Sequence, residues 1–334
     1  MILSPPIIAL TLGSVATSLL ALYASVPGIR ILRHWDLTSG SERQLQLEKR
    51  TYLISTLMAC AFVFQIGSLF LFIFTAEDLH DLFVGAMCAA GTLNVNGFGY
   101  PTVLLKIGNA LLGGLWLIVN SADNRAYDYP LIRKKYALLL ILTPLLLSEA
   151  VLQGAYFSGL EANVITSCCG SLFGDEASGP ASWLAALPLK PLQAALVTAL
   201  AILFVSGMLF HAGRPWAGAV FSITGLATFF ISLAALVSFI SPYIYELPTH
   251  HCPFCILQRE YSYIGYFIYA FLLGGTVPGM AVGALLPFRN IESLRAVLPP
   301  VLRRLTLWSL AAYALFALVS AYAIAFSALS LEMG

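Results

Sequence analysis

The sequence predicts an all-α integral membrane protein with eight transmembrane helices. The 334 residues are 59% apolar and 10% charged, whereas a soluble globular domain carries about 25% charged residues. The mean hydropathy is +0.86, and apolar runs recur that reach the roughly 20 residues needed to cross a bilayer. Because backbone polar groups in lipid must be satisfied within the protein, these runs predict helices and not open sheets.

The eight apolar runs are separated by short connections. They cover residues 5–28, 52–75, 101–121, 136–158, 189–210, 217–241, 261–287 and 305–329. No basic residue precedes the first run, and Arg30 and Arg33 follow it. This order is typical of an uncleaved helix with its N-terminus outside, and not of a signal peptide. Pro144 and Glu149 interrupt the fourth run, which we keep because the alternation of basic loops requires a span there.

Basic residues concentrate in the odd-numbered connections, which predicts the orientation. Fourteen of the 17 Lys and Arg residues lie there: Arg30, Arg33, Arg43, Lys49 and Arg50 in the first, Arg125, Arg133, Lys134 and Lys135 in the third, Arg214 in the fifth, and Arg289, Arg295, Arg303 and Arg304 in the seventh. Short loops rich in Lys and Arg remain on the cytoplasmic side. We therefore expect both termini and the even-numbered loops to be exofacial (N-out/C-out).

Composition and missing motifs exclude several function classes. A formal net charge of +1 without a basic patch argues against nucleic-acid binding. All five histidines lie in expected loops or at helix ends, which argues against a transmembrane haem-b protein. No Walker-type loop, HExxH or nucleophile elbow is present. A secondary transporter that uses Lys106 and Glu149 stays open.

Five of the six cysteines fall in expected exofacial segments. These are Cys88, Cys168, Cys169, Cys252 and Cys255, whereas Cys60 lies inside a span. Disulfides form and persist in oxidising compartments. The distribution therefore indicates either structural disulfides or thiol–disulfide exchange on the outer face.

The spacing of Cys252 and Cys255 favours exchange chemistry. Cys252-Pro253-Phe254-Cys255 is a CxxC motif that we expect at the start of the seventh helix, where a helix N-terminus lowers a thiol pKa. Arg259 follows four residues later and would share a helix face with Cys255. A fixed cation there would stabilise a thiolate or an anionic reduced ligand.

The stretch CPFCILQR, Cys252 to Arg259, resembles the redox motif of the DsbB family of quinone-linked membrane disulfide oxidases. Residues 136–287 are similar in order to the vitamin K epoxide reductase family, in which a helix leads into an exofacial cysteine loop, two helices follow, and CxxC opens the fourth. SCCGSLFG, Ser167 to Gly174, is similar to that loop. Here the loop cysteines are adjacent, and an adjacent pair closes a strained ring, so the stable partner of one is Cys252 or Cys88.

The resemblance implies an N-terminal membrane region at 1–135, with a Gly/Asn-rich exofacial loop at 87–101, and a four-helix redox bundle plus a final span at 136–334. It implies a thiol–disulfide oxidoreductase that relays electrons between an exported thioredoxin-like or other thiol protein and a membrane quinone, ubiquinone or menaquinone. Cys252 would exchange with the loop, Cys255 would face the quinone, and Cys168 and Cys169 would meet the external thiols. We expect a bacterial cytoplasmic (inner) membrane with the cysteine loops in the periplasm.

Several aromatic residues follow CPFC and are candidates for the quinone site. Tyr263, Tyr266 and Phe267 lie on the side of Arg259 at helical spacing and could wall a flat ring, although core packing explains them as well. His251 could tune a thiol or accept a proton during quinone reduction.

Two alternative functions and two residue assignments stay open. His250, His251, Cys252 and Cys255 could bind zinc or copper, as in a metal-handling permease. The cysteines could also form only structural disulfides in a non-catalytic membrane subunit. Lys106 and Glu149 are ionisable residues inside spans and serve either proton transfer or helix locking, and Cys88 is either a third redox position or part of a turn-rich connection.

Overall fold

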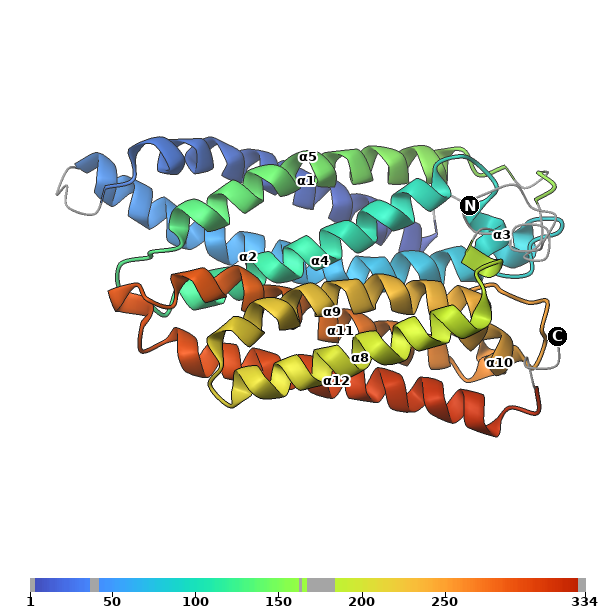
Figure 1. Cartoon of the computed structure of the whole chain (residues 1–334). Helices are drawn as coiled ribbons and strands as arrows, with labels where there is room; N and C mark the ends of the chain where they lie inside the picture. The colour runs from blue at the N-terminus through green and yellow to red at the C-terminus, as the bar shows by residue number, and fades with distance from the viewer. Residues whose placement is uncertain (1–3, 37–41, 162–163, 167–183, 330–334) are drawn as a thin grey trace. The chain divides into compact units, whose positions relative to one another are not determined.

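The computed structural model describes residues 4–36, 42–161, 164–166 and 184–329, and these residues are almost entirely helical. Eight helices among them are long and apolar enough to cross a membrane (Figure 1). The long helices are α1 (Pro5–His34), α2 (Glu42–Asp78), α4 (Gly99–Asp123), α5 (Ile132–Ser158), α8 (Leu189–His211), α9 (Pro215–Ala235), α11 (Ile264–Leu285) and α12 (Leu298–Phe326). The predicted helical fold with eight candidate spans is confirmed, and the predicted orientation stays a prediction.

The sixth span is longer than its apolar run and changes helix type. After α9 the chain continues through a π-helical turn, Leu236–Ile240, into α10 (Ser241–Tyr245). A π-turn inside an α-helix commonly occurs at functional sites. Here it presents the Val237 carbonyl to the segment that carries CPFC.

The chain divides into two compact units. The first contains Met1–Thr75, Asn96–Leu160 and Pro287–Leu302, and the second contains Ala76–Val95, Glu161–Leu286 and Arg303–Gly334. These units are defined by packing, whereas the division into 1–135 and 136–334 was inferred from a resemblance. That second division stays a prediction.

In the first unit, α1 and α4 both pack against α5. The core of this unit is aromatic at its centre, where the Phe62 and Trp116 rings lie 5.1 Å apart and Tyr136 is fully buried. Trp116 Nε1 donates to the Lys135 carbonyl at 3.0 Å. The large aromatic side chains are thus packed together in the core, and the hydrogen bond to the Lys135 carbonyl satisfies the polar N–H of the Trp116 indole.

Two buried ion pairs also join α4 to α5. Lys106 Nζ lies 2.7 Å from Glu149 Oε1, and Lys135 Nζ lies 2.8 Å from Asp123 Oδ2, with all four side chains at most 1% exposed. Buried charges require such partners because isolated ions are costly to desolvate. The expected placement of Lys106 and Glu149 inside the protein is confirmed.

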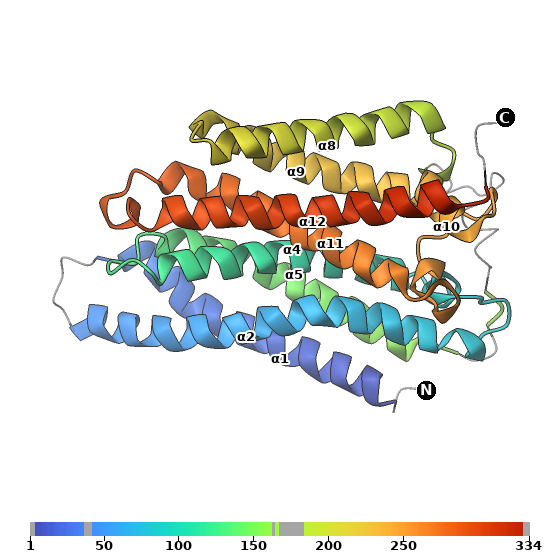
Figure 2. The same cartoon turned by 90° about the horizontal axis from the view of Figure 1, so that it is seen from below.

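In the second unit, α9 packs against both α8 and α11, and α11 packs against α12. The last contact is close because Gly275 faces the Tyr313 ring, whose hydroxyl bonds Thr276 and the Gly225 carbonyl. Figure 2 shows α8, α9, α11 and α12 lying along one another. The resemblance would place residues 136–158 in this bundle, whereas α5 packs in the first unit and α12 is the fourth long helix here.

Candidate functional site

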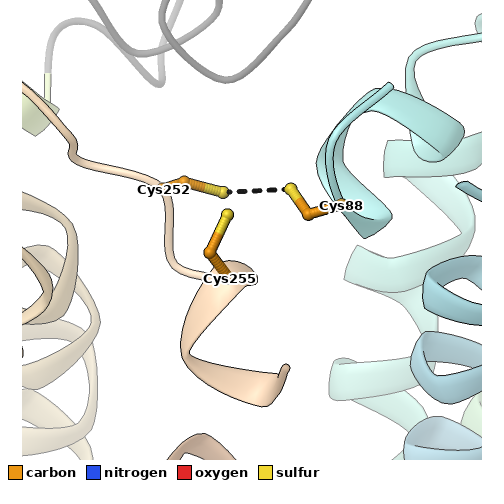
Figure 3. A group of neighbouring side chains, drawn as sticks. All are labelled: Cys88, Cys252 and Cys255. Atoms are coloured by element: carbon orange, nitrogen blue, oxygen red, sulfur yellow. Dashed lines mark hydrogen bonds between the residues drawn. The ribbon is translucent and has the colours of Figure 1, made fainter. Parts of the chain in front are cut away.

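Three cysteines of the second unit converge in a buried cluster, which we call the three-cysteine site: Cys88, Cys252 and Cys255. Cys88 and Cys252 are 0% exposed and Cys255 is 5% exposed. The Cys88 and Cys252 sulfurs lie 3.6 Å apart, and all three sulfurs lie within 4.8 Å of one another. Figure 3 shows them pointing toward a common centre. The 3.6 Å separation is a non-bonded contact, whereas a disulfide bond is about 2.05 Å long.

Cys88 is held in an extended conformation directly before the short helix α3 (Ala89–Leu93). Its carbonyl accepts a hydrogen bond from Gly91 N–H at 3.0 Å. The next amide, Ala89 N–H, donates to Glu77 Oε2 at 2.6 Å. These contacts fix the backbone on the C-terminal side of Cys88, so the thiol is presented from a defined turn.

The structure corrects the expected position of CPFC. Cys255–Leu257 and Arg259–Tyr261 form two short 3₁₀ turns, and α11 begins only at Ile264. Ser262 and Tyr263, with φ of 54° and 55°, separate them, and a left-handed residue cannot continue a right-handed α-helix.

This position has two consequences for the predicted chemistry. The expectation that the α11 N-terminus activates Cys255 is wrong, and so is the expectation that Cys255 and Arg259 share one α-helix face. Arg259 is exposed, whereas Cys255 is buried. A role for Arg259 stays a prediction.

Aromatic side chains frame CPFC. The Tyr245 hydroxyl donates to the Cys252 carbonyl, and the Tyr269 hydroxyl donates to the Pro253 carbonyl at 2.7 Å. The Tyr245 ring also contacts the His250 ring at 4.5 Å and the Tyr261 ring at 4.7 Å between centroids. These contacts hold the segment before and after Cys252 against α10 and α11.

The two histidines before CPFC have different surroundings. His251 Nδ1 donates to the Val237 carbonyl of the π-helical turn at 3.1 Å. Burial lowers the pKa of His250 below its ordinary 6.5, while the Cys88 charge raises that pKa and His251 lowers it further. This shift favours the neutral imidazole of His250, which is the form that can accept a proton.

A groove of about 470 Å³ lies between the end of α10, the start of α11 and the end of α12. Its lining is Tyr243, Ile244, Glu246, Tyr261, Ser262, Ile264, Phe267, Tyr322, Ala323, Phe326 and Ser327. Burial raises the pKa of Tyr261, and the Cys255 charge raises it further, so this groove residue lies within electrostatic range of Cys255. The Tyr322 and Phe326 rings, which also line the groove, lie on α12 with their centroids 4.5 Å apart.

Of the residues predicted to bind a quinone, Phe267 lines the groove, whereas Tyr263, Tyr266 and His251 do not. Phe267 lines the groove and is 59% exposed. Tyr263 and Tyr266 pair ring to ring at 6.3 Å and are not part of that lining, and His251 is held by the π-helical turn. The predicted loop residues Cys168 and Cys169 lie outside the described residues.

Sequence reasoning missed three residues of this site. Tyr245 lies among the apolar residues at the end of the sixth span, so no local pattern marks it. The side chains of Glu77 and Gln258 meet at 2.6 Å, but the two residues are too far apart in sequence to form a local pattern. The one usable signal was an acidic residue at the C-terminal end of the second span, a position where polar groups are costly without a partner.

No protein-family model, curated protein or solved structure matches this chain.

Proposed function

We propose that this protein is an integral membrane thiol–disulfide oxidoreductase that relays electrons between exofacial protein thiols and a membrane quinone. The observation that carries the proposal is the contact of 3.6 Å between the Cys88 and Cys252 sulfurs, with Cys255 in the same buried cluster. A structural disulfide needs two sulfurs. A third sulfur within reach allows a disulfide to be passed from one pair to another.

The exchange step within the cluster conserves electrons. The Cys88 thiolate attacks the Cys252 sulfur of a Cys252–Cys255 disulfide. The Cys88–Cys252 bond forms as the Cys252–Cys255 bond breaks, and Cys255 leaves as a thiolate. The contact distance between Cys88 and Cys252 supports this order of attack, because reacting atoms about 3–3.5 Å apart are close to a productive geometry.

The loop pair is the proposed second exchange partner. Thr166 is anchored beside the Cys88 loop, since its N–H donates to the Val84 carbonyl at 3.0 Å and its hydroxyl donates to the Gly91 carbonyl at 2.8 Å. Cys168 follows Thr166 by two residues, and two residues of extended chain span at most about 7 Å. Attack of a Cys168 or Cys169 thiolate on Cys88 would release Cys252 and leave a disulfide for the external partner.

The groove is the proposed place for the quinone ring. A groove of this size with aromatic walls suits a flat apolar ring, and Tyr261 and Phe267 lie on its wall. When bound, a quinone supplies an acceptor for the two electrons and two protons that the Cys252 and Cys255 thiols lose. Neutral His250 is the proposed first acceptor of one thiol proton, and exposed Arg259 is the proposed partner of an anionic reduced ring.

The side of the membrane and the partner are part of the same proposal. The basic odd-numbered loops support a cytoplasmic position for those loops and an exofacial position for the cysteines. An oxidising compartment outside a bacterial cytoplasmic membrane and an exported thioredoxin-like thiol protein would then complete the relay.

Thiol trapping of the purified protein under anaerobic conditions tests the proposal. Each cysteine is alkylated and quantified by mass spectrometry, first in the reduced protein and then after addition of ubiquinone or menaquinone. We expect Cys252 and Cys255 to lose alkylation with quinone, and Cys88 to follow. Cys60, which is exposed on α2 in the first unit, is the internal control and should stay alkylated.

A Cys88→Ser variant separates the relay from a simple CxxC oxidation. Quinone should still oxidise Cys252 and Cys255 in this variant, whereas transfer to Cys168 and Cys169 should stop. If Cys252 and Cys255 keep their thiols in the presence of either quinone, the proposed electron acceptor is wrong.

The same cluster supports a second candidate function, binding of a soft metal ion in a metal-handling permease. Three sulfurs within 4.8 Å of one another can ligate zinc or copper(I). This set contains Cys88 in place of the predicted His250 and His251. Metal analysis of protein purified under reducing conditions is the test: about one ion for each chain, lost in Cys88→Ser, would support it, and metal-free protein that responds to quinone would contradict it.

A further inference from the structure

Glu77 occupies a position that the exchange chemistry does not use directly but that connects both halves of the three-cysteine site. Its side chain is 13% exposed at the end of α2. Its two carboxylate oxygens have different partners: Oε2 accepts from Ala89 N–H and Oε1 accepts from the Gln258 side-chain amide, both at 2.6 Å. Hydrogen bonds to an ionised carboxylate are short and about twice as strong as neutral ones.

Gln258 completes the connection from the other side. The same Nε2 that donates to Glu77 also donates to the Met87 carbonyl at 2.9 Å. Met87 and Ala89 flank Cys88, and Gln258 follows Cys255 by three residues. We call these contacts of Glu77, Gln258 and the backbone of Met87 and Ala89 the Glu77–Gln258 bridge.

The Glu77–Gln258 bridge fixes the distance between two segments that are remote in sequence. Cys88 and Cys252 are 164 residues apart, so their sulfurs meet only if the segments around them are held together. Between Glu77 and Cys88 the chain contains one 3₁₀ turn, His80–Leu82, and a left-handed Gly85. Thr166 holds this loop at Val84 and Gly91, but these bonds do not involve CPFC. The Glu77–Gln258 bridge ties the residues on both sides of Cys88 to Gln258, which follows CPFC.

We infer that Glu77 is a positioning residue that, through Gln258, selects Cys252 as the disulfide partner of Cys88. The inference rests on the proposed function, since it names the residue that directs the exchange step. It concerns an equilibrium between cysteines and does not depend on a quinone.

The test measures two disulfide equilibria in the full-length chain, with Cys60, Cys168 and Cys169 replaced by Ser. A Cys255→Ser variant of this protein leaves only the Cys88–Cys252 pair, and a Cys88→Ser variant leaves only the Cys252–Cys255 pair. Each protein is equilibrated with glutathione redox buffers in detergent, and the disulfide fraction is measured by mass spectrometry after acid quenching.

We expect Glu77→Gln to lower the equilibrium constant for the Cys88–Cys252 disulfide by about tenfold, and Glu77→Ala by more. Gln258→Met, which keeps the side-chain length without the donor, should have a similar effect. The Cys252–Cys255 equilibrium should stay within about twofold in all of these variants. Asp78→Asn is the matched control, because it makes the same change at an exposed neighbour of Glu77, and it should alter neither equilibrium.

Each outcome decides the inference. Equal losses for both disulfides would show a general structural role for Glu77 and overturn it, as would an unchanged Cys88–Cys252 equilibrium in Glu77→Gln and Gln258→Met. A selective loss supports it even if quinone leaves the cysteines unchanged, in which case the proposed electron acceptor fails and the positioning role stands.

Discussion

Replacing Glu149 tests whether the polar centre of the first unit is a locked ion pair. Its carboxylate is 1% exposed and accepts from Lys106 Nζ at 2.7 Å, from Asn109 Nδ2 at 2.6 Å and from the Gln65 amide. Lys106 also donates to Ser68 at 3.1 Å. Glu149→Leu leaves the ammonium and two amides without their shared acceptor.

The expected magnitude follows from these contacts. Breaking a buried ion pair by removing one partner costs about 3–5 kcal/mol, because the remaining charge is left uncompensated. Each orphaned amide adds about 1 kcal/mol at the lower end of its range, which alternative partners in a membrane protein reduce. We therefore expect Glu149→Leu to lower the free energy of unfolding by about 4 kcal/mol. Lys106→Met should cost less, because the carboxylate keeps its two amide donors.

The assay is equilibrium unfolding in mixed micelles with increasing SDS, applied to both single variants and to Lys106→Met/Glu149→Leu. The double variant should lose less stability than the sum of the two single losses, with a coupling of about 2 kcal/mol. If the two single losses simply add, the side chains do not act as a pair and the reasoning is wrong.

Three further predictions follow from single contacts. Burial holds the pKa of His250 below 6.5, so the unfolded chain binds the proton first and stability is lost as the pH falls below about 6.5. Thermal unfolding between about pH 7.5 and 5 should therefore show a smaller loss of stability in His250→Phe than in the unchanged protein. Equal pH slopes for the two proteins would contradict this prediction. A Cβ at Gly275 would lie 2.7 Å from the Tyr313 ring, whereas a Cβ at Gly274 would meet only the Ala312 Cβ at 4.0 Å. Gly275→Ala should therefore lower the stability in thermal unfolding by about 1–3 kcal/mol, while Gly274→Ala is neutral or stabilising. Tyr245→Phe removes the donor to the Cys252 carbonyl and should change the Cys252–Cys255 disulfide equilibrium by about fivefold; an unchanged equilibrium in glutathione buffers would show that this hydroxyl does not position CPFC.

The eight candidate spans could be predicted because hydropathy is a local property that accumulates over about 20 residues. The least regular run, around Pro144, forms the continuous helix α5, and its buried Glu149 is matched by polar groups on α2 and α4. Helix ends were harder to place. The sequence predicts that the seventh helix begins near CPFC, but it begins at Ile264 because Ser262 and Tyr263 have left-handed conformations. Serine and tyrosine rarely adopt a positive φ, so the sequence contains no signal for this break.

The site was predictable to the extent that its chemistry is local. The CxxC motif is recognised from four consecutive residues, whereas its expected exofacial side, inferred from the basic loops, stays a prediction. The approach of Cys88 to Cys252 was not predictable, because it depends on contacts across 164 residues and on one carboxylate that has no sequence pattern with its partners. Glu77 bonds an amide 181 residues away, a pairing that only the packed structure defines.

The two ion pairs of the first unit have opposite polarity, and this arrangement specifies the register of α4 against α5. Helix α4 carries Lys106 and Asp123, and the antiparallel α5 carries Glu149 and Lys135. The charges are separated by 17 residues on α4 and 14 on α5, roughly 25 and 21 Å along the axes. Sliding α5 by one turn, about 5.4 Å, would break both pairs at once and leave four buried charges. Apolar packing alone tolerates such a slide better, so the ion pairs contribute specificity more than net stability. Lys135→Glu, which places two carboxylates together at Asp123, should therefore lower the free energy of unfolding in SDS micelles.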